Sequence, residues 1–147
     1  TAQVINHHTG EQVAEAQCKI SPEQFGLFLA AVGAKYNCGL IAPERNGLGI
    51  STVQKLEQIE YPNLYRQRSV TPAEEYSEQG IYGFLTTGNS KVSIVNWGAS
   101  LVLEGESGIV SEALVAEMKI FVRDDKGRTG SSRGGNDDIL LAWLISQ

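Results

Sequence analysis

Apolar and polar residues alternate at residues 14–20, near the start of the chain. The apolar positions are Ala14, Ala16, Cys18 and Ile20, and Glu15, Gln17 and Lys19 lie between them. A period of two is typical of a strand with one face in solvent. The preceding Thr9-Gly10 pair suits a turn, because glycine readily adopts a positive φ. The pattern predicts a β-hairpin with Val4 and Ile5 in the partner strand.

The next segment carries the signals of a helix start. Ser21 suits the N-cap, Pro22 the first helical position, and Gln24 completes a capping box. Apolar residues then recur at helical spacing, at Phe25, Phe28, Leu29 and Val32. We expect an amphipathic helix that ends near Asn37 and Gly39.

The remaining elements follow from shorter patterns. Residues 38–43 (CGLIAP) form an apolar run without alternation, typical of a strand covered on both faces. Further helices are expected over 47–60 and 90–104, after Ser111, and from about Asn136; short strands are expected at 64–68 and 119–123. In the 90–104 helix the apolar residues Val92, Val95, Ala99 and Val102 are periodic. Residues 69–88 look like a loop.

This order of elements predicts one α/β domain over residues 1–147, built on a mixed sheet flanked by helices. No interdomain linker is visible. The last helix is apolar on all sides, which is typical of a buried helix.

Composition narrows the classes of function. The chain has 147 residues with 12 Lys and Arg against 17 Asp and Glu, a formal net charge of −5. This balance argues against a protein that coats nucleic acid by charge alone, but leaves room for an enzyme with a local basic patch. No apolar run is long enough to span a membrane, and the N-terminal residues do not resemble a signal peptide. Two cysteines cannot form a four-cysteine zinc site.

Acidic residues stand at three places of interest. Glu44 ends the apolar run, where a ligand crevice of an α/β sheet would lie, although its position alone favours a solvated strand-end glutamate. Asp137 and Asp138 lie at the start of the last helix. Either Asn136 is the N-cap and the two acids interact favourably with the helix dipole, or the acids hold a hard cation. Asp124 and Asp125 lie in an expected hairpin turn, where aspartate is favoured because its side chain hydrogen-bonds the local backbone.

Five basic residues lie within fifteen positions of one another, just before this aspartate pair. They are Lys119, Arg123, Lys126, Arg128 and Arg133. A phosphate-gripping arm beside a metal site has this arrangement, and so does a hairpin with a solvated face.

Several motifs occur together in a fixed order: PERNGLG (43–49), YPNLY (61–65), YGFLTTGNSK (82–91), SEALVAEMKIFV (111–122) and GGNDDILLAWLI (134–145). As a set they resemble the C-terminal nuclease domain of the large terminase subunit of tailed bacteriophages. The resemblance covers nearly the whole chain. It implies a ribonuclease-H-like fold and cleavage of concatemeric double-stranded DNA during genome packaging.

The resemblance also implies a site. Members of this family use three acidic positions to hold two divalent metal ions, Mg²⁺ or Mn²⁺. Glu44 matches one position and Asp137 and Asp138 match another. The family's first aspartate lies on a first strand, which we expect upstream of Thr1 and which this sequence does not contain. Lys91 matches a basic position that contacts DNA, and Lys126, Arg128 and Arg133 are further candidates for DNA contact.

The expected chemistry is two-metal hydrolysis of a phosphodiester, in the cytoplasm of the host cell during viral assembly. Further partners implied are the portal, the small terminase subunit and the packaging ATPase domain, whose P-loop motif is not found in this sequence. Two alternatives stay open. One is a Holliday-junction-resolvase-like nuclease of the same fold, and the other is a catalytically silent module that docks DNA or the portal.

Overall fold

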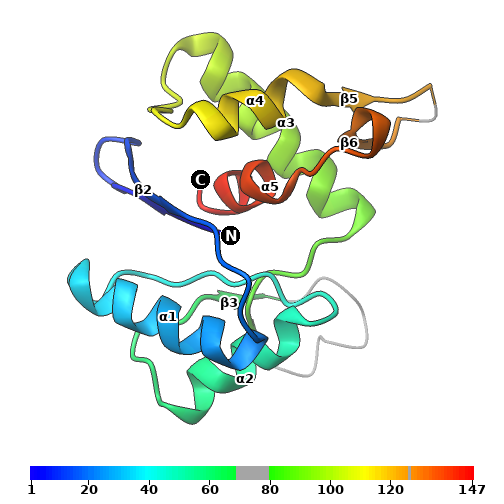
Figure 1. Ribbon diagram of the computed structural model, residues 1–147. Coiled ribbons are helices and arrows are strands. Elements are labelled where there is room, and N and C mark those ends of the chain that lie inside the picture. Colours follow the sequence, from blue (N-terminus) through cyan, green and yellow to red (C-terminus); the bar gives the residue numbers. More distant parts are fainter. Residues whose placement is uncertain (69–79, 126) are drawn as a thin grey trace. The chain divides into compact units, whose positions relative to one another are not determined.

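The computed structural model describes residues 1–68, 80–125 and 127–147, with all their side chains except that of Arg133 (Figure 1). The chain forms two compact units. Unit 1 contains Thr1–Cys18 and Thr87–Gln147, and unit 2 is the continuous stretch Lys19–Thr86. The described residues combine helices with small antiparallel sheets, which is compatible with the predicted α/β class, and the single-domain assignment for 1–147 stays a prediction.

Unit 2 begins with the helix whose start the sequence predicted. Helix α1 spans Pro22–Lys35, and both hydrogen bonds of the capping box between Ser21 and Gln24 are present. Helix α2, Gly49–Gln58, packs against it and buries Thr52, Val53 and Leu56. The Thr52 hydroxyl donates to the Pro22 carbonyl at 3.0 Å, which ties the two helices together.

The apolar run after α1 does not form the continuous strand that we expected. Ile41 and Glu44 instead make isolated parallel bridges, to Leu64 and to Phe84 respectively. Pro43, between them, has no N–H to donate, so a regular ladder cannot run through this segment. The short strands β3, Arg66–Gln67, and β4, Ile81–Tyr82, pair antiparallel beside it.

Unit 1 opens with the predicted hairpin, in a shorter form. Strand β1, Ala2–Ile5, pairs antiparallel with β2, Gln12–Ala16. The ladder ends at the Ala2–Ala16 pair, so the alternation beyond Ala16 is not used and both Cys18 and Ile20 are exposed. A second hairpin joins β5, Phe121–Arg123, to β6, Thr129–Ser131, and a single 3₁₀ turn, Ser132–Gly134, follows.

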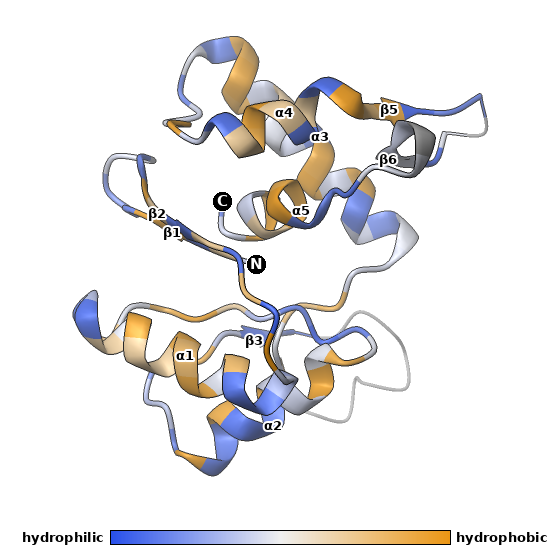
Figure 2. Ribbon diagram, in the orientation of Figure 1, coloured by the Kyte–Doolittle hydropathy of each residue, from blue (hydrophilic) through white to orange (hydrophobic). Residues whose placement is uncertain are grey.

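The core of unit 1 forms around helix α5, Asp138–Ile145, as its apolar colouring in Figure 2 shows. Strand β1 and the helices α3, Gly88–Glu104, and α4, Glu112–Ile120, pack against α5. The buried core residues are Leu114, Ile139, Leu140, Trp143 and Leu144. The prediction that the last helix is buried is therefore confirmed.

The apolar periodicity of α3 matches its buried face only in part, at Val95. Ile94, Val95 and Leu101 pack against the core, while Val92 and Val102 are 38% and 47% exposed. Gly98 explains the difference, because a Cβ there would lie 2.9 Å from Cζ3 of Trp143. The backbone of α3 approaches α5 through this glycine, and so the buried face centres on a residue with no apolar side chain.

The sheets also differ from the single mixed sheet that we expected. In the described ranges the strands form three separate two-stranded antiparallel sheets, and the parallel pairs are isolated bridges. Among the helices of those ranges, none combines the length and apolar character that a bilayer span needs.

Candidate functional site

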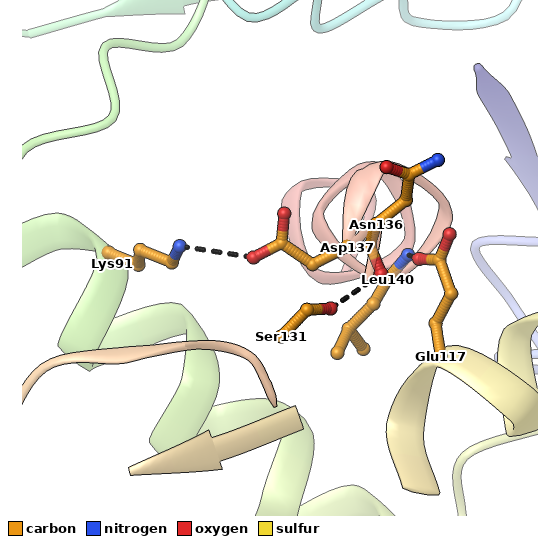
Figure 3. Close-up of polar contacts among 6 residues, drawn as sticks. All are labelled: Lys91, Glu117, Ser131, Asn136, Asp137 and Leu140. Carbon is orange, nitrogen blue, oxygen red and sulfur yellow. Dashed lines mark hydrogen bonds and ion pairs between the residues drawn. The ribbon is translucent and has the colours of Figure 1, made fainter. Parts of the chain in front are cut away.

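Asp137 and Asp138 stand at the start of α5, in unit 1. Asp137 occupies the N-cap position, but its side chain makes no capping hydrogen bond with the described part of the helix. The Asp137 carboxylate turns instead toward Lys91, with 3.4 Å between Oδ2 and Nζ (Figure 3). The alternative in which Asn136 is the cap is wrong. The carbonyl of Asn136 accepts a hydrogen bond from the Ser131 hydroxyl at 2.6 Å.

The cap of α5 comes from another helix. Glu117, on α4, accepts a hydrogen bond from the backbone N–H of Leu140 at 2.9 Å (Figure 3). Leu140 is the third helical residue, whose N–H the N-cap side chain ordinarily receives. Glu117 is not among the site residues predicted from the sequence. The sequence feature that could have indicated this role is the position of Glu117 three residues after the buried Leu114, on the side of α4 that faces the core.

Lys91 lies in the first turns of α3, behind the capping box of Thr87 and Ser90. Its ammonium group also lies over the ring of Phe121, 5.7 Å from the centroid. The side chains of Lys91 and Asp137 are 24% and 23% exposed. The structure thus brings together two residues that are 46 positions apart and that the sequence singled out separately.

Glu44 lies in unit 2, where the backbone around it is firmly held. The Arg45 N–H donates to the Phe84 carbonyl, and the Phe84 N–H donates to the Pro43 carbonyl, each at 2.8 Å. Gly49 packs its Cα against the Glu44 carbonyl, where a Cβ would overlap the oxygen. The half-buried carboxylate of Glu44 makes no hydrogen bond or ion pair with any other described residue. It is therefore available to a ligand.

The predicted basic arm is only partly described. Arg128 pairs with Asp124 across the β5–β6 turn, with 2.7 Å between Nη2 and Oδ2, and 76% of its side chain is exposed. Asp124 also accepts from the Arg128 backbone N–H, so the prediction of turn chemistry there is confirmed. Arg123 donates to Asn96 of α3 at 3.0 Å. Lys126 and the side chain of Arg133 lie outside the described residues.

The carboxylate oxygens of this chain are ligands of the kind that Mg²⁺ and Mn²⁺ prefer. Asp137 and Asp138 are adjacent and partly accessible, with Asp138 exposed. Within residues 1–68, 80–125 and 127–147, however, no group of three or more His, Cys, Asp or Glu side chains gathers around one point. Glu44 belongs to unit 2 and the aspartate pair to unit 1. The donors fit in kind, but fewer gather than the three that the resemblance implies.

Comparison of the chain with protein-family models, with curated proteins and with solved structures finds no match. A functional assignment therefore depends on the chain's own residues and on the ordered motifs described above.

Proposed function

We propose that this protein is a divalent-metal-dependent endonuclease domain of ribonuclease-H-like fold, of the kind found in the large terminase subunit, and that it cuts concatemeric double-stranded viral DNA. The pairing of Lys91 with Asp137 is the observation that carries the proposal. It places a cation suited to a DNA phosphate beside a carboxylate suited to a metal.

A purely structural explanation of this pair is weak. Both side chains are about a quarter exposed, and an ion pair of that kind contributes roughly 1 kcal/mol or less. Asp137 does not cap α5, because Glu117 supplies the hydrogen bond. The Asp137 carboxylate thus contributes little to the stability of the fold, and it stays accessible to a cation from solvent.

The proposal assigns roles to named residues. Asp137 and Asp138 act as metal ligands, and Glu44 is proposed as a ligand on the strength of its free carboxylate and of the PERNGLG motif. Bound Mg²⁺ or Mn²⁺ would supply activation of water and neutralisation of phosphate charge. Lys91 and the basic arm, Lys126, Arg128 and Arg133, contact the DNA backbone, which gives little sequence preference and a steep dependence on salt.

The proposed setting is viral assembly in the host cytoplasm. The partners would then be double-stranded DNA, the portal, the small terminase subunit and the packaging ATPase domain. Each can be tested by pull-down once cleavage is established.

A plasmid-nicking assay with Mg²⁺ or Mn²⁺ tests the proposal, on a chain that includes the strand that the resemblance implies upstream of Thr1. Asp138→Asn and Glu44→Gln should each reduce cleavage by about a hundredfold or more, since each removes a charged ligand. The matched controls are Asp125→Asn and Glu57→Gln, which neutralise exposed acids of the same two units and should cleave as the wild type does. Undiminished cleavage in both site variants would overturn the assignment.

The alternatives predict other results. A resolvase-like nuclease would cut branched DNA in preference to linear duplex. A silent docking module would show no heat of Mn²⁺ binding at millimolar concentration in calorimetry, yet would still retain DNA or the portal.

A further inference from the structure

We propose that Glu117 is a positioning residue for Asp137. By capping α5 from α4, Glu117 releases the Asp137 carboxylate from capping and leaves it turned toward Lys91. The metal that the Asp137 carboxylate would bind rests on the proposed function. The capping of α5 by Glu117 in place of Asp137 does not rest on it.

An aspartate at an N-cap ordinarily caps its own helix, since its side-chain oxygen accepts the N–H of the second or third helical residue. Three other helices of this chain follow that rule. Ser21, Thr87 and Ser111 each accept the N–H of the third helical residue, at 3.2, 3.1 and 3.0 Å. Helix α5 departs from it although Asp137 has a suitable side chain.

The backbone of Asp137 also departs from capping geometry. Ser21, Thr87 and Ser111 are extended, with ψ of 155°, 171° and 120°. Asp137 has φ −131° and ψ 19°. An N-cap side chain reaches its target from the extended region. Asp137 thus lacks the backbone conformation of the three capping residues while Glu117 holds the Leu140 N–H.

Glu117 fills the position that Asp137 leaves. Leu140 is only 4% exposed, so an unpaired N–H there would lose hydrogen bonding to water without replacement. The Glu117 carboxylate meets this N–H at 2.9 Å, and its negative charge lies at the positive end of the α5 dipole. Figure 3 shows the outcome, with Glu117 directed at Leu140 and Asp137 directed at Lys91.

Two variants of Glu117 separate positioning from charge. Glu117→Gln keeps a side-chain oxygen that can accept the Leu140 N–H, whereas Glu117→Ala removes it. In the alanine variant we expect Asp137 to turn back to the helix and leave Lys91. The glutamine variant is the matched control and should keep Asp137 in place.

Three measurements test whether Glu117 caps α5 in place of Asp137. Hydrogen exchange at the Leu140 amide should be unchanged by Asp137→Ala, which removes the side-chain acceptor, but about tenfold faster if Asp137 were the cap. The carboxyl ¹³C shift of Asp137 should respond to Lys91→Met in the wild type and in Glu117→Gln, but not in Glu117→Ala. Calorimetric Mn²⁺ affinity should fall about tenfold in Glu117→Ala alone, as removal of an outer-shell partner commonly causes.

Each outcome decides one point. Faster exchange at Leu140 in Asp137→Ala overturns the positioning role, and it does so even if Glu117→Ala does not fold. An Asp137 shift that still responds to Lys91→Met in Glu117→Ala also overturns it. If the wild type binds no Mn²⁺, the metal-dependent function fails, while the exchange and shift data still decide the role of Glu117.

Discussion

The side chain of Asn46 hydrogen-bonds both backbone groups of Thr86. Its Nδ2 donates to the Thr86 carbonyl at 2.8 Å, and its Oδ1 accepts the Thr86 N–H at 2.9 Å. The amide group thus acts as a peptide unit would, and it continues the pairing of Glu44 with Phe84 beyond the end of the bridge.

Removal of this amide should destabilise unit 2. Asn46→Ala loses two hydrogen bonds and should lower the free energy of unfolding by about 1–2 kcal/mol in a urea titration. Gln54→Ala, at an exposed amide of the same unit, is the control and should be neutral. Equal stability of Asn46→Ala and the control would contradict the role of the amide.

Gln12 holds the N-terminal hairpin to the segment between α3 and α4. It is 4% exposed, and its Oε1 accepts the N–H groups of Val110 and Ser111 at 3.0 and 2.9 Å. Gln12→Ala leaves both N–H groups unpaired and should cost about 2–4 kcal/mol, measured by chemical denaturation. Gln17→Ala, at an exposed position of the same unit, should change stability little.

Gly49 allows the Glu44 carbonyl to approach the start of α2. A Cβ at this position would overlap that backbone oxygen, which cannot move aside as a side chain can. Gly49→Ala should therefore lower the melting temperature through an overpacking cost of about 1–3 kcal/mol. Gly88→Ala is the comparison, because a Cβ at Gly88 meets nothing within 4 Å. A melting temperature for Gly49→Ala at or above that of Gly88→Ala would refute the steric argument.

Tyr61 should make unit 2 sensitive to alkaline pH. Burial, assisted by the nearby Cys38, raises the pKa of the Tyr61 phenol above its ordinary value of 10.0. The phenol donates to the Gly39 carbonyl at 2.7 Å. Because the folded pKa exceeds the unfolded one, the folded state holds this proton more tightly. The resulting stabilisation is complete below the unfolded pKa, near 10, and is lost as pH rises through the folded pKa.

The change to test is Tyr61→Phe, with Tyr36→Phe as an exposed control. Tyrosinate absorbance should show a late-titrating phenol in the wild type and in Tyr36→Phe, and that phenol should vanish in Tyr61→Phe. The loss of stability above pH 10 should also be shallower in Tyr61→Phe. Unchanged late titration in that variant would assign it to another residue.

The features that the sequence predicted correctly depend on near neighbours. Ser21 and Gln24 are three residues apart, and Asp124 and Arg128 are four apart. Such signals lie within a single turn of chain, where local stereochemistry decides the conformation.

The features that it missed depend on distant partners. Glu117 and Leu140 are 23 residues apart, and Asn46 and Thr86 are 40 apart. The apolar pattern of α3 indicated its buried face only in part for a related reason, because Gly98 allows close approach to Trp143 without contributing to an apolar pattern. For the candidate site, motifs selected Lys91 and Asp137 but not their contact, which depends on how α3 and α5 pack.

The division of the chain has a consequence for biosynthesis. Unit 2 is continuous, whereas unit 1 joins Thr1–Cys18 to Thr87–Gln147. The Thr1 hydroxyl donates to the Asp138 carbonyl, 137 residues away. At ordinary translation rates the ribosome needs on the order of ten seconds to cover that distance. Unit 2 can complete its core during this interval. The segment of strands β1 and β2 is synthesised first, but helix α5, against which β1 packs, is synthesised last.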